Sequence, residues 1–549
     1  MAAKSVLDLV DVQFQDATNH TSITSTDTIG LVMPFYWGEC DKVSVFNRTD
    51  FFEMYPESLP IGVTQITTTD LYSGYAQVKN AFSHGASEVE IYRPSDGWRF
   101  QGITITNAGV IAAKVAAKDG EKYDESKAVS ISLKYAGFVP QSLAYGYDNV
   151  AFAVKFANST EYTDGTMITV AVFGKKGNAY DSTPIEVFEG AASPTAKIGG
   201  ESIFLEDVVN GNSQFIDVRV TANVVIASPT SEQLSYQYVD CDAYTEPTVN
   251  ATFKNGIDKG YAMFDDYESS ICTMLISPFV SKETKVNATV LLDECDTKIK
   301  NIAEYRKNCL AVVGYPIDYN SVYSKENVET YFNSHSGKGS KFVIAVQGCE
   351  YVSVFGQRFT LNCVGGYCGS MVNVAKEAHL NQIASGYIYG NYGGSLKKSL
   401  LSGKVIDLME VGINSVYASK RGNLIWGTRT MYNRQSSYYG KINVMRVCTM
   451  ILKNIFPIAI ETLHTDAASN PITRASLSTM LNSVIDTYIA NQDLQPDSVA
   501  DCSDSINTDY LTKGGTVLNI ILRLHFIGLV ERVNIKIIAT DTSVTAEFV

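Results

Sequence analysis

Three residues of the types found in serine proteases follow one another along the chain: Asp296, His335 and Ser370. Subtilisin-type enzymes use an acid, a base and a nucleophile in this order. The Cys-Gly-Ser-Met stretch around Ser370 is similar to the surroundings of such a nucleophile. Only 35 residues separate His335 from Ser370, however, too few for the strands and helices that normally lie between base and nucleophile. We therefore expect ordinary loop residues here, no catalytic residue and no enzymatic activity.

The sequence also gives little support for a metal site or a nucleotide site. The ten cysteines form no Cys-x-x-Cys pair and the chain has only six histidines, so we expect no metal site. Residues 337–340 (Gly-Lys-Gly-Ser) lack the upstream glycine of a phosphate-binding loop, and we expect no cofactor. The cysteines are expected to be buried reduced thiols, with disulfides formed later in an assembled product as the alternative.

Length and charge set broad limits. A chain of 549 residues predicts three or four domains, and a net charge of -14 argues against direct binding to nucleic-acid phosphates. The charge is uneven, because residues 434–549 carry nine basic and eleven acidic residues and the rest of the chain carries the remaining -12. We see no apolar run of membrane-span length and no secretory signal in residues 1–10, so we expect folding in a cytosol.

The first half of the chain changes character at about residue 98. Residues 1–15 predict an apolar strand, residues 16–28 a polar linker, and residues 29–97 mixed strands and a helix. From 98 to 285 the sequence predicts a β-rich region. Short segments of alternating apolar and polar residues lie between Gly, Asn and Asp turns, at 102–107, 128–135, 150–156, 167–173 and 215–220.

The second half predicts alternating strands and helices, and then an α+β unit. We expect strands at 286–292, 309–314 and 342–346, with Asp296 capping a helix that reaches about residue 308. Near-continuous apolar strands between helices indicate a parallel sheet that is buried on both faces. Further on we expect helices at 442–456 and from 471 through 488, the second of them capped by Asn470, and a hairpin of 518–526 with 530–539 around Gly528.

The most specific pattern is a Gly-Ile-Asn turn followed by a Trp-Gly-x-Arg-Thr stretch: Gly412, Ile413, Asn414, Trp426, Gly427, Arg429 and Thr430. This pattern resembles the hallmark of the contractile phage tail sheath proteins. Other stretches resemble the same family in the same order along the chain: 28–38, 82–93, 174–178, 207–213 and 442–446. Each piece alone is weak, whereas the ordered set spans nearly the whole chain.

The resemblance implies a multidomain fold of the α/β and α+β classes. Its parts are a subtilisin-like α/β core that is not an active protease, inserted β-sandwich or β-barrel domains, and an α+β C-terminal domain with terminal strand-exchange arms. The implied boundaries are 1–28 for the arm and linker, 29–97 and 286–430 for the core, 98–285 for an outward-facing insertion, 431–542 for a tube-facing C-terminal domain and 543–549 for the second arm.

The resemblance also implies a structural subunit that polymerises as stacked hexameric rings around a tail tube. The polymer would contract by repacking of its subunits and so drive the tube through a host envelope for genome delivery. Expected partners are other copies of the chain and the tail tube, baseplate and tail terminator proteins, without nucleic acid or membrane insertion. The expected location is a phage virion assembled in the host cytoplasm. The alternatives are the sheath of a phage-derived contractile injection system, a subtilisin-like hydrolase, and an adhesin or surface-layer subunit.

Given this resemblance, we expect two sets of residues to make assembly contacts. Short apolar strands at both ends would join neighbouring subunits by β-augmentation, through Val6, Leu7, Leu9, Val10, Val12, Phe14, Val544, Ala546 and Phe548. The helix that begins after Asn470 would face the tube, with Arg474 and Asp486 as polar contacts. The alternative for this helix is that it only packs the core of its domain.

Overall fold

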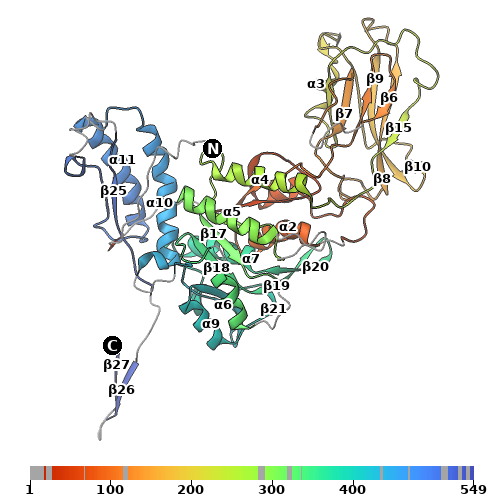
Figure 1. Ribbon diagram of the computed structural model, residues 1–549. Helices are drawn as coiled ribbons and strands as arrows, with labels where there is room; N and C mark the ends of the chain where they lie inside the picture. Colours follow the sequence, from red (N-terminus) through yellow and green to blue (C-terminus); the bar gives the residue numbers. More distant parts are fainter. Residues whose placement is uncertain are drawn as a thin grey trace.

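The computed structural model describes residues 18–19, 27–66, 69–114, 121–281, 291–317, 324–334, 337–432, 437–467, 470–507, 517–529, 535–539 and 544–548. These residues form three parts (Figure 1): a central α/β core, a β-rich domain that stands away from the core, and a C-terminal unit on the other side. A hairpin at the C-terminal end is drawn apart from all three.

An eight-stranded sheet forms the centre of the core, in the order β23-β22-β18-β17-β16-β2-β4-β3. The six inner strands run parallel and the two edge strands are antiparallel to their neighbours. Strands β2, β17 and β18 are buried at every position, which confirms the predicted parallel sheet covered on both faces. The bounds are β2 Thr28–Val32, β3 Val43–Asn47, β4 Glu88–Tyr92, β16 Met274–Ile276, β17 Leu310–Gly314, β18 Val343–Gln347, β22 Ile413–Ser419 and β23 Gly422–Trp426.

Two helix pairs, α4 with α5 and α2 with α7, cover the sheet. Gly30 lies against Phe264 of α4 and the next residue, Leu31, against Gly74 of α2. Successive residues of a strand point to opposite faces, so the two pairs lie on opposite sides of the sheet. The helices of the core are α1 Arg48–Met54, α2 Ser73–Ser83, α4 Ala251–Asp265, α5 Leu291–Arg306, α6 Lys325–Ser334, α7 Val364–Glu377, α8 Gly386–Tyr389 and α9 Ser402–Glu410. A small sheet beside them pairs β19 Cys349–Val354 with β20 Gln357–Asn362 and β21 Ser395–Lys398.

The prediction of a strand at 286–292 is wrong for residues 291 and 292, the part of this range that the structure describes. Leu291 and Leu292 begin helix α5, and Asp296 lies inside that helix and not at its cap. The sheet strand is β16, at Met274–Ile276, and it follows helix α4 in a stretch that we had assigned to the β-rich insertion. An apolar run of this length fits a buried helix turn as well as a strand, and periodicity alone does not separate them. Residues 286–290 lie outside the described part.

The β-rich domain contains two antiparallel sheets, as expected for the insertion. One has the order β14-β7-β5-β6, the other β10-β9-β8-β15 with β11 added to β9. Ile131 of the first and Phe152 of the second belong to one apolar core. The bounds are β5 Gly102–Ile105, β6 Ile111–Ala113, β7 Val129–Leu133, β8 Asn149–Ala157, β9 Met167–Lys176, β10 Ala179–Tyr180, β11 Glu186–Ala191, β14 Ile216–Val220 and β15 Gln237–Asp240, with a ribbon of β12 Lys197–Ile198 and β13 Glu201–Ser202 and the short helix α3 Leu205–Val209.

Two long helices and a small sheet form the C-terminal unit. Helix α10 spans Ile442–Glu461 and α11 spans Pro471–Ala490. The Asn470 side chain accepts a hydrogen bond from the Ile472 backbone N–H at 3.0 Å, which confirms the predicted cap. The sheet orders β1 Thr18–Asn19, β25 Ile521–His525 and β24 Val499–Asp501. These elements enclose an apolar cluster of their own, separate from that of the core.

Helix α10 corrects the expectation that no segment approaches the length of a membrane span. Among the described residues it is a helix that is long and apolar enough to cross a membrane, but 78% of its most apolar stretch is buried inside the protein. The central helix of a folded domain meets the same length and composition, so this feature by itself is weak evidence for a span.

The hairpin predicted around Gly528 is wrong. Strand β25 pairs with β24 and β1, and β26 (Ile535–Ala539) pairs with β27 (Val544–Phe548). The C-terminal arm is therefore a two-stranded hairpin that begins before residue 543. The linker also ends earlier than residue 28, because Asp27 and Thr28 are both buried at the start of β2.

The cysteines behave as structural thiols. All ten lie in described residues, none is paired in a disulfide, and nine are buried while Cys40 is half-buried. Burial raises the pKa of the Cys309 and Cys349 thiols to about 11, so these two stay protonated and unreactive at neutral pH.

Candidate functional site

The Gly-Ile-Asn and Trp-Gly-x-Arg-Thr residues lie where the core passes into the C-terminal unit. Gly412, with a φ of +88°, links α9 to β22, and Trp426 ends β23. Trp426 packs edge-on against Tyr387, with 5.8 Å between the ring centroids. Residues 427–432, which follow β23, contact the start of β18. The pattern is thus a structural junction.

Asn414 is the centre of this junction. It is fully buried, and its side-chain amide donates to the carbonyl of Ala345 at 3.0 Å and to that of Arg429 at 2.8 Å. Its side-chain oxygen accepts from the Arg429 backbone N–H at 3.1 Å. One asparagine therefore fixes β18, β22 and the segment after β23, because buried backbone groups need such partners.

The segment after Gly427 connects the sheet to the first turn of α10. The Met431 N–H donates to the carbonyl of Val343 in β18 at 2.9 Å. The carbonyl of Thr428 accepts from the Ile442 N–H at 2.9 Å, which satisfies one of the donors that the start of a helix leaves open. The Thr430 hydroxyl donates to the Tyr439 carbonyl at 2.8 Å.

Gly427→Ala should destabilise the protein through this junction. Gly427 has a φ of +142°, and an added Cβ would lie 2.3 Å from the Asn414 side-chain oxygen. Gly422, with a φ of +110°, has no atom within 4 Å of the same position and provides a matched control. Backbone strain alone should lower the unfolding free energy by about 1–2 kcal/mol in Gly422→Ala. The clash should add roughly 1–3 kcal/mol in Gly427→Ala. Equal losses in denaturant unfolding would contradict this role of Asn414.

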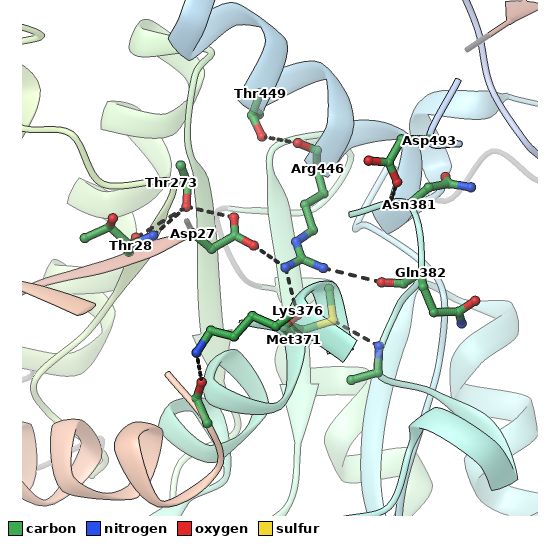
Figure 2. A network of polar contacts seen from close by, with 12 residues as sticks. Asp27, Thr28, Thr273, Met371, Lys376, Asn381, Gln382, Arg446, Thr449 and Asp493 are labelled. Carbon is green, nitrogen blue, oxygen red and sulfur yellow. Dashed lines mark hydrogen bonds and ion pairs between the residues drawn. The ribbon is translucent and has the colours of Figure 1, made fainter. Parts of the chain in front are cut away.

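A buried ion pair ties α10 to the start of the core sheet (Figure 2). The Arg446 guanidinium donates to the Asp27 carboxylate, and both residues are almost fully buried, at 1% and 3% exposure. Arg446 also donates to the carbonyls of Met371 at 2.7 Å and Gln382 at 3.4 Å. Asp27 in turn accepts from the Thr273 hydroxyl at 3.0 Å. A single side chain thereby joins α10, α7, the loop after α7 and the residue that precedes β2.

A second polar cluster lies beside the first, in the loop after α7. Asn381 accepts from the Asn443 side chain at 2.8 Å and donates to the carbonyl of Ile527 at 3.2 Å. Its backbone N–H donates to the Asp493 carboxylate, which also lies 3.1 Å from a ring nitrogen of His379. This loop therefore contacts α10, the segment after α11 and the residues that follow β25. We call the two clusters together the polar joint.

Tyr267 adds a further contact between the core and α10. Pro457 lies inside α10 and has no N–H to donate to the carbonyl of Lys453. The Tyr267 hydroxyl, from the segment between α4 and β16, donates to that carbonyl at 3.4 Å. The Tyr267 ring also packs edge-on against Phe456. The core thus supplies a donor that the helix itself lacks.

Glu350 is a buried carboxyl on the other side of the core. Its side chain accepts from the Asn80 amide at 2.7 Å and from the Tyr392 hydroxyl. Burial raises the pKa of Glu350 to about 7. Burial likewise raises the pKa values of Tyr392 and Cys363 beside it, so both stay neutral, and lowers that of His84, whose ring stacks on Tyr392.

This carboxyl should make the protein less stable as the pH rises. Between pH 4.5 and 7 the folded protein keeps a proton on Glu350 that the unfolded chain releases, so stability is highest below 4.5 and falls until about 7. The loss should reach about 3 kcal/mol. Glu350→Gln removes this titration and should melt higher than the wild type at pH 8, with the advantage shrinking toward pH 4.5. A difference between the two proteins that does not change with pH would contradict the prediction.

The residues considered for proteolysis do not form an active site in the described part of the chain. Ser370 is buried in α7, and its hydroxyl donates to the carbonyl of Gly366 at 2.9 Å. Asp296 is fully buried inside α5, and burial raises the pKa of its carboxyl well above the usual value. His335 lies outside the described residues. Among those that are described, no group of three or more His, Cys, Asp or Glu side chains is placed to hold a metal ion.

Comparison with known proteins yields matches at the level of structure. No protein-family model and no curated protein matches the sequence. The sheath tail protein from Listeria innocua matches with a TM-score of 0.52 and 11% identity, over 88% of this chain and 90% of that one. The chain has the fold of a sheath tail protein.

Two further solved structures are similar over most of their length. The sheath tail protein from Desulfitobacterium hafniense matches with a TM-score of 0.47 and 11% identity, over 90% of this chain and 93% of that one. A chain of the anti-feeding prophage baseplate matches with a TM-score of 0.48 and 11% identity, over 97% and 98%. The Listeria structure is described as a sheath tail protein, the family that the resemblance in the sequence predicted.

The structure places the residues predicted to face a tube in different environments. Arg474 is 3% exposed, pairs with Asp504 and donates to the carbonyl of Ala467 at 3.2 Å. It therefore stabilises the C-terminal unit internally, which corrects its prediction as a surface contact. Asp486 is exposed, in a shallow hollow along α11 lined by Ala475, Ser478, Thr479, Asn482, Ser483, Thr487 and Ala490.

The predicted arm residues are described only at the C-terminal end. The register of β26 with β27 sets Val544 opposite Ala539, Ala546 opposite Ile537 and Phe548 opposite Ile535. Residues 6–14 lie outside the described part. Close to them in sequence, Thr18 and Asn19 of β1 pair in parallel with Leu524 and His525 of β25, in the C-terminal unit of the same chain.

Proposed function

We propose that this protein is the structural subunit of a contractile tail sheath. It polymerises as stacked six-fold rings around a tail tube and contracts by repacking of rigid subunits, which drives the tube through a host envelope. In a phage this delivers the genome. The sheath of a phage-derived injection system would use the same mechanics and remains the second reading. The fold shared with the Listeria sheath tail protein supports both.

The observation that carries the proposal is the terminal hairpin. Among the described residues β26 and β27 pair only with each other, and an isolated two-stranded hairpin is at best marginally stable in water. A third strand completes such a sheet, and an exposed strand edge recruits one from another chain. The hairpin is therefore built as a connector between subunits.

Strand β25 offers a place for an incoming strand. It pairs with β24 through Ile521, Leu522 and Arg523, whereas β1 covers only Leu524 and His525 on its other edge. The edge along residues 521–523 has no partner strand in the described part of the chain, and Ile521 is 40% exposed. A terminal strand of a neighbouring subunit would extend the sheet here.

The polar joint gives the subunit the rigidity that repacking requires. Arg446 and Asn381 each hold elements of the core and the C-terminal unit together. Contraction would then change the contacts between subunits and leave each subunit intact. The extended lattice would be a kinetically trapped state, and a few kcal/mol for each subunit suffices when many copies move together.

We place the C-terminal unit against the tube and the β-rich domain outward. Residues 434–549 are nearly neutral, and the shallow hollow along α11 is lined by small residues with Asp486 as its charge. Small side chains allow close approach of another surface. Baseplate and tail terminator proteins would hold the two ends of the polymer, and a virion is the expected location.

Negative-stain electron microscopy of the purified chain, at rising concentration and with its tube protein, tests the proposal. Tubes with six-fold symmetry are expected. A protein that stays monomeric throughout would contradict it.

A second test separates this function from that of a subtilisin-like hydrolase. Ser370→Ala should leave assembly unchanged, and a serine-reactive probe should not label the wild type, because the Ser370 hydroxyl is engaged inside α7. Labelling of Ser370 would favour the hydrolase.

A further inference from the structure

One stretch of the chain has a net positive charge, although the whole protein is negatively charged. Residues 337–432 carry ten basic and four acidic residues, a net of +6 in a protein of net charge -14. Four of the basic residues are exposed at one end of the core: Lys397 and Lys398 on β21, and Lys420 and Arg421 in the turn between β22 and β23. In Figure 1, β21 and α9 lie at the lower end of the core.

The segments that carry these cations are neighbours on the surface of the core. Ser399, next to Lys398, accepts from the Ala418 N–H at 2.7 Å, which joins the end of β21 to the end of β22. The turn residues Lys420 and Arg421 follow directly, and the Arg421 guanidinium lies 4.7 Å from the centre of the Tyr387 ring. We call this surface, with β23 as the edge of the sheet, the basic edge.

Large apolar side chains are exposed beside the cations. Ile388 and Leu401 are each 81% exposed and Tyr387 is 55% exposed. Exposed apolar side chains surrounded by charged ones are typical of protein–protein interfaces. The basic edge therefore has the composition of a surface that contacts another protein.

The opposite edge of the same sheet is acidic. Strand β3 ends the sheet there and α1 follows it directly. Residues 38–57 carry five acidic and two basic residues. Asp50 and Glu53 of α1 are exposed, as is Val45 of β3 at 43%. We call this surface the acidic edge; Lys42 and Arg48 are its exposed basic residues.

We propose that the basic edge of one subunit docks on the acidic edge of the next copy of this chain. The two edges terminate one rigid sheet, so a head-to-tail contact between them repeats around a ring. Their charges are complementary, and each offers exposed apolar side chains for the centre of the contact. Complementary charge fixes the register of such a contact and excludes like-charged pairings. The inference rests on the proposed assembly and adds a lateral contact to that of the arms.

Charge reversal tests the contact. The first variant is Lys420→Glu with Arg421→Glu, the second is Asp50→Lys with Glu53→Lys, and the third combines all four changes. A matched control, Lys176→Glu with Lys197→Glu, changes the net charge by the same amount as the first variant, but on the exposed surface of the β-rich domain. Sedimentation and electron microscopy give the critical concentration for assembly, and the melting temperature reports that each variant is folded.

The first and second variants should each raise the critical concentration at least about tenfold, because like charges then meet at the contact. The combined variant should assemble close to the wild-type concentration, since it restores opposite charges, and the control should assemble normally. Normal assembly of the first or second variant would overturn the inference, as would a folded combined variant that fails to assemble. A wild-type protein that never polymerises would overturn the proposed function, and this contact with it.

Discussion

Arg446→Met is expected to lower the free energy of unfolding by about 3–5 kcal/mol, which would be the largest loss from any single substitution considered for this protein. The substitution leaves the Asp27 carboxylate buried at 3% exposure without its guanidinium partner. The carbonyls of Met371 and Gln382 lose a donor at the same time. Denaturant unfolding followed by tryptophan fluorescence measures the loss.

Two controls isolate the buried charge. Asp27→Leu combined with Arg446→Met replaces the pair by apolar side chains and should recover most of the loss, because apolar replacements of buried ion pairs are often neutral. Arg48→Met removes an exposed arginine and should change stability by no more than about 0.5 kcal/mol. A loss below about 1 kcal/mol in Arg446→Met would show that the ion pair does not hold the joint together.

Deleting residues 533–549 should abolish polymerisation and leave the melting temperature nearly unchanged. A strand of five residues, the length of β26 and β27, adds several backbone hydrogen bonds of about 0.5–1.5 kcal/mol each to a neighbouring sheet. Partial burial of an apolar side chain such as Phe548 adds up to about 1.5–3 kcal/mol. Repeated across a lattice these contacts are strong, whereas the lone subunit gains little from them.

Deleting residues 1–15 provides the matching experiment at the other end. Both truncated proteins should be soluble folded monomers in analytical ultracentrifugation, and both should fail to form tubes. Regular tubes from either protein would exclude strand exchange by that arm. Loss of folding in either would show that the terminal strand belongs to the core of its own subunit.

The sequence allowed the layers of the fold to be predicted where periodicity and caps agree. The apolar strands β2, β17 and β18 and the Asn470 cap of α11 follow from local pattern. The strand at 274–276 could not be predicted from the sequence, because three residues give too short a pattern. Pairing was also missed: the apolar runs at 518–526 and 530–539 look like hairpin partners, but each has a better partner elsewhere in the chain.

The contacts of the polar joint could not be predicted from the sequence. Arg446 lies in a stretch that we had recognised as family-like, yet its partner Asp27 is 419 residues away, and no local pattern links them. Arg474 shows the opposite error, since a charged residue on a helix is normally exposed. Only the tertiary structure shows that it pairs with Asp504 inside the C-terminal unit.

The central claim is that subunits are joined through their terminal strands, and a cryo-electron microscopy reconstruction of the polymer formed by the full-length protein tests it most directly. The predicted map shows the β26–β27 hairpin of one subunit completed by strands of neighbouring subunits, with residues 6–14 contributing a strand to a chain other than their own. A polymer in which both ends of the chain contact only their own subunit would contradict the account.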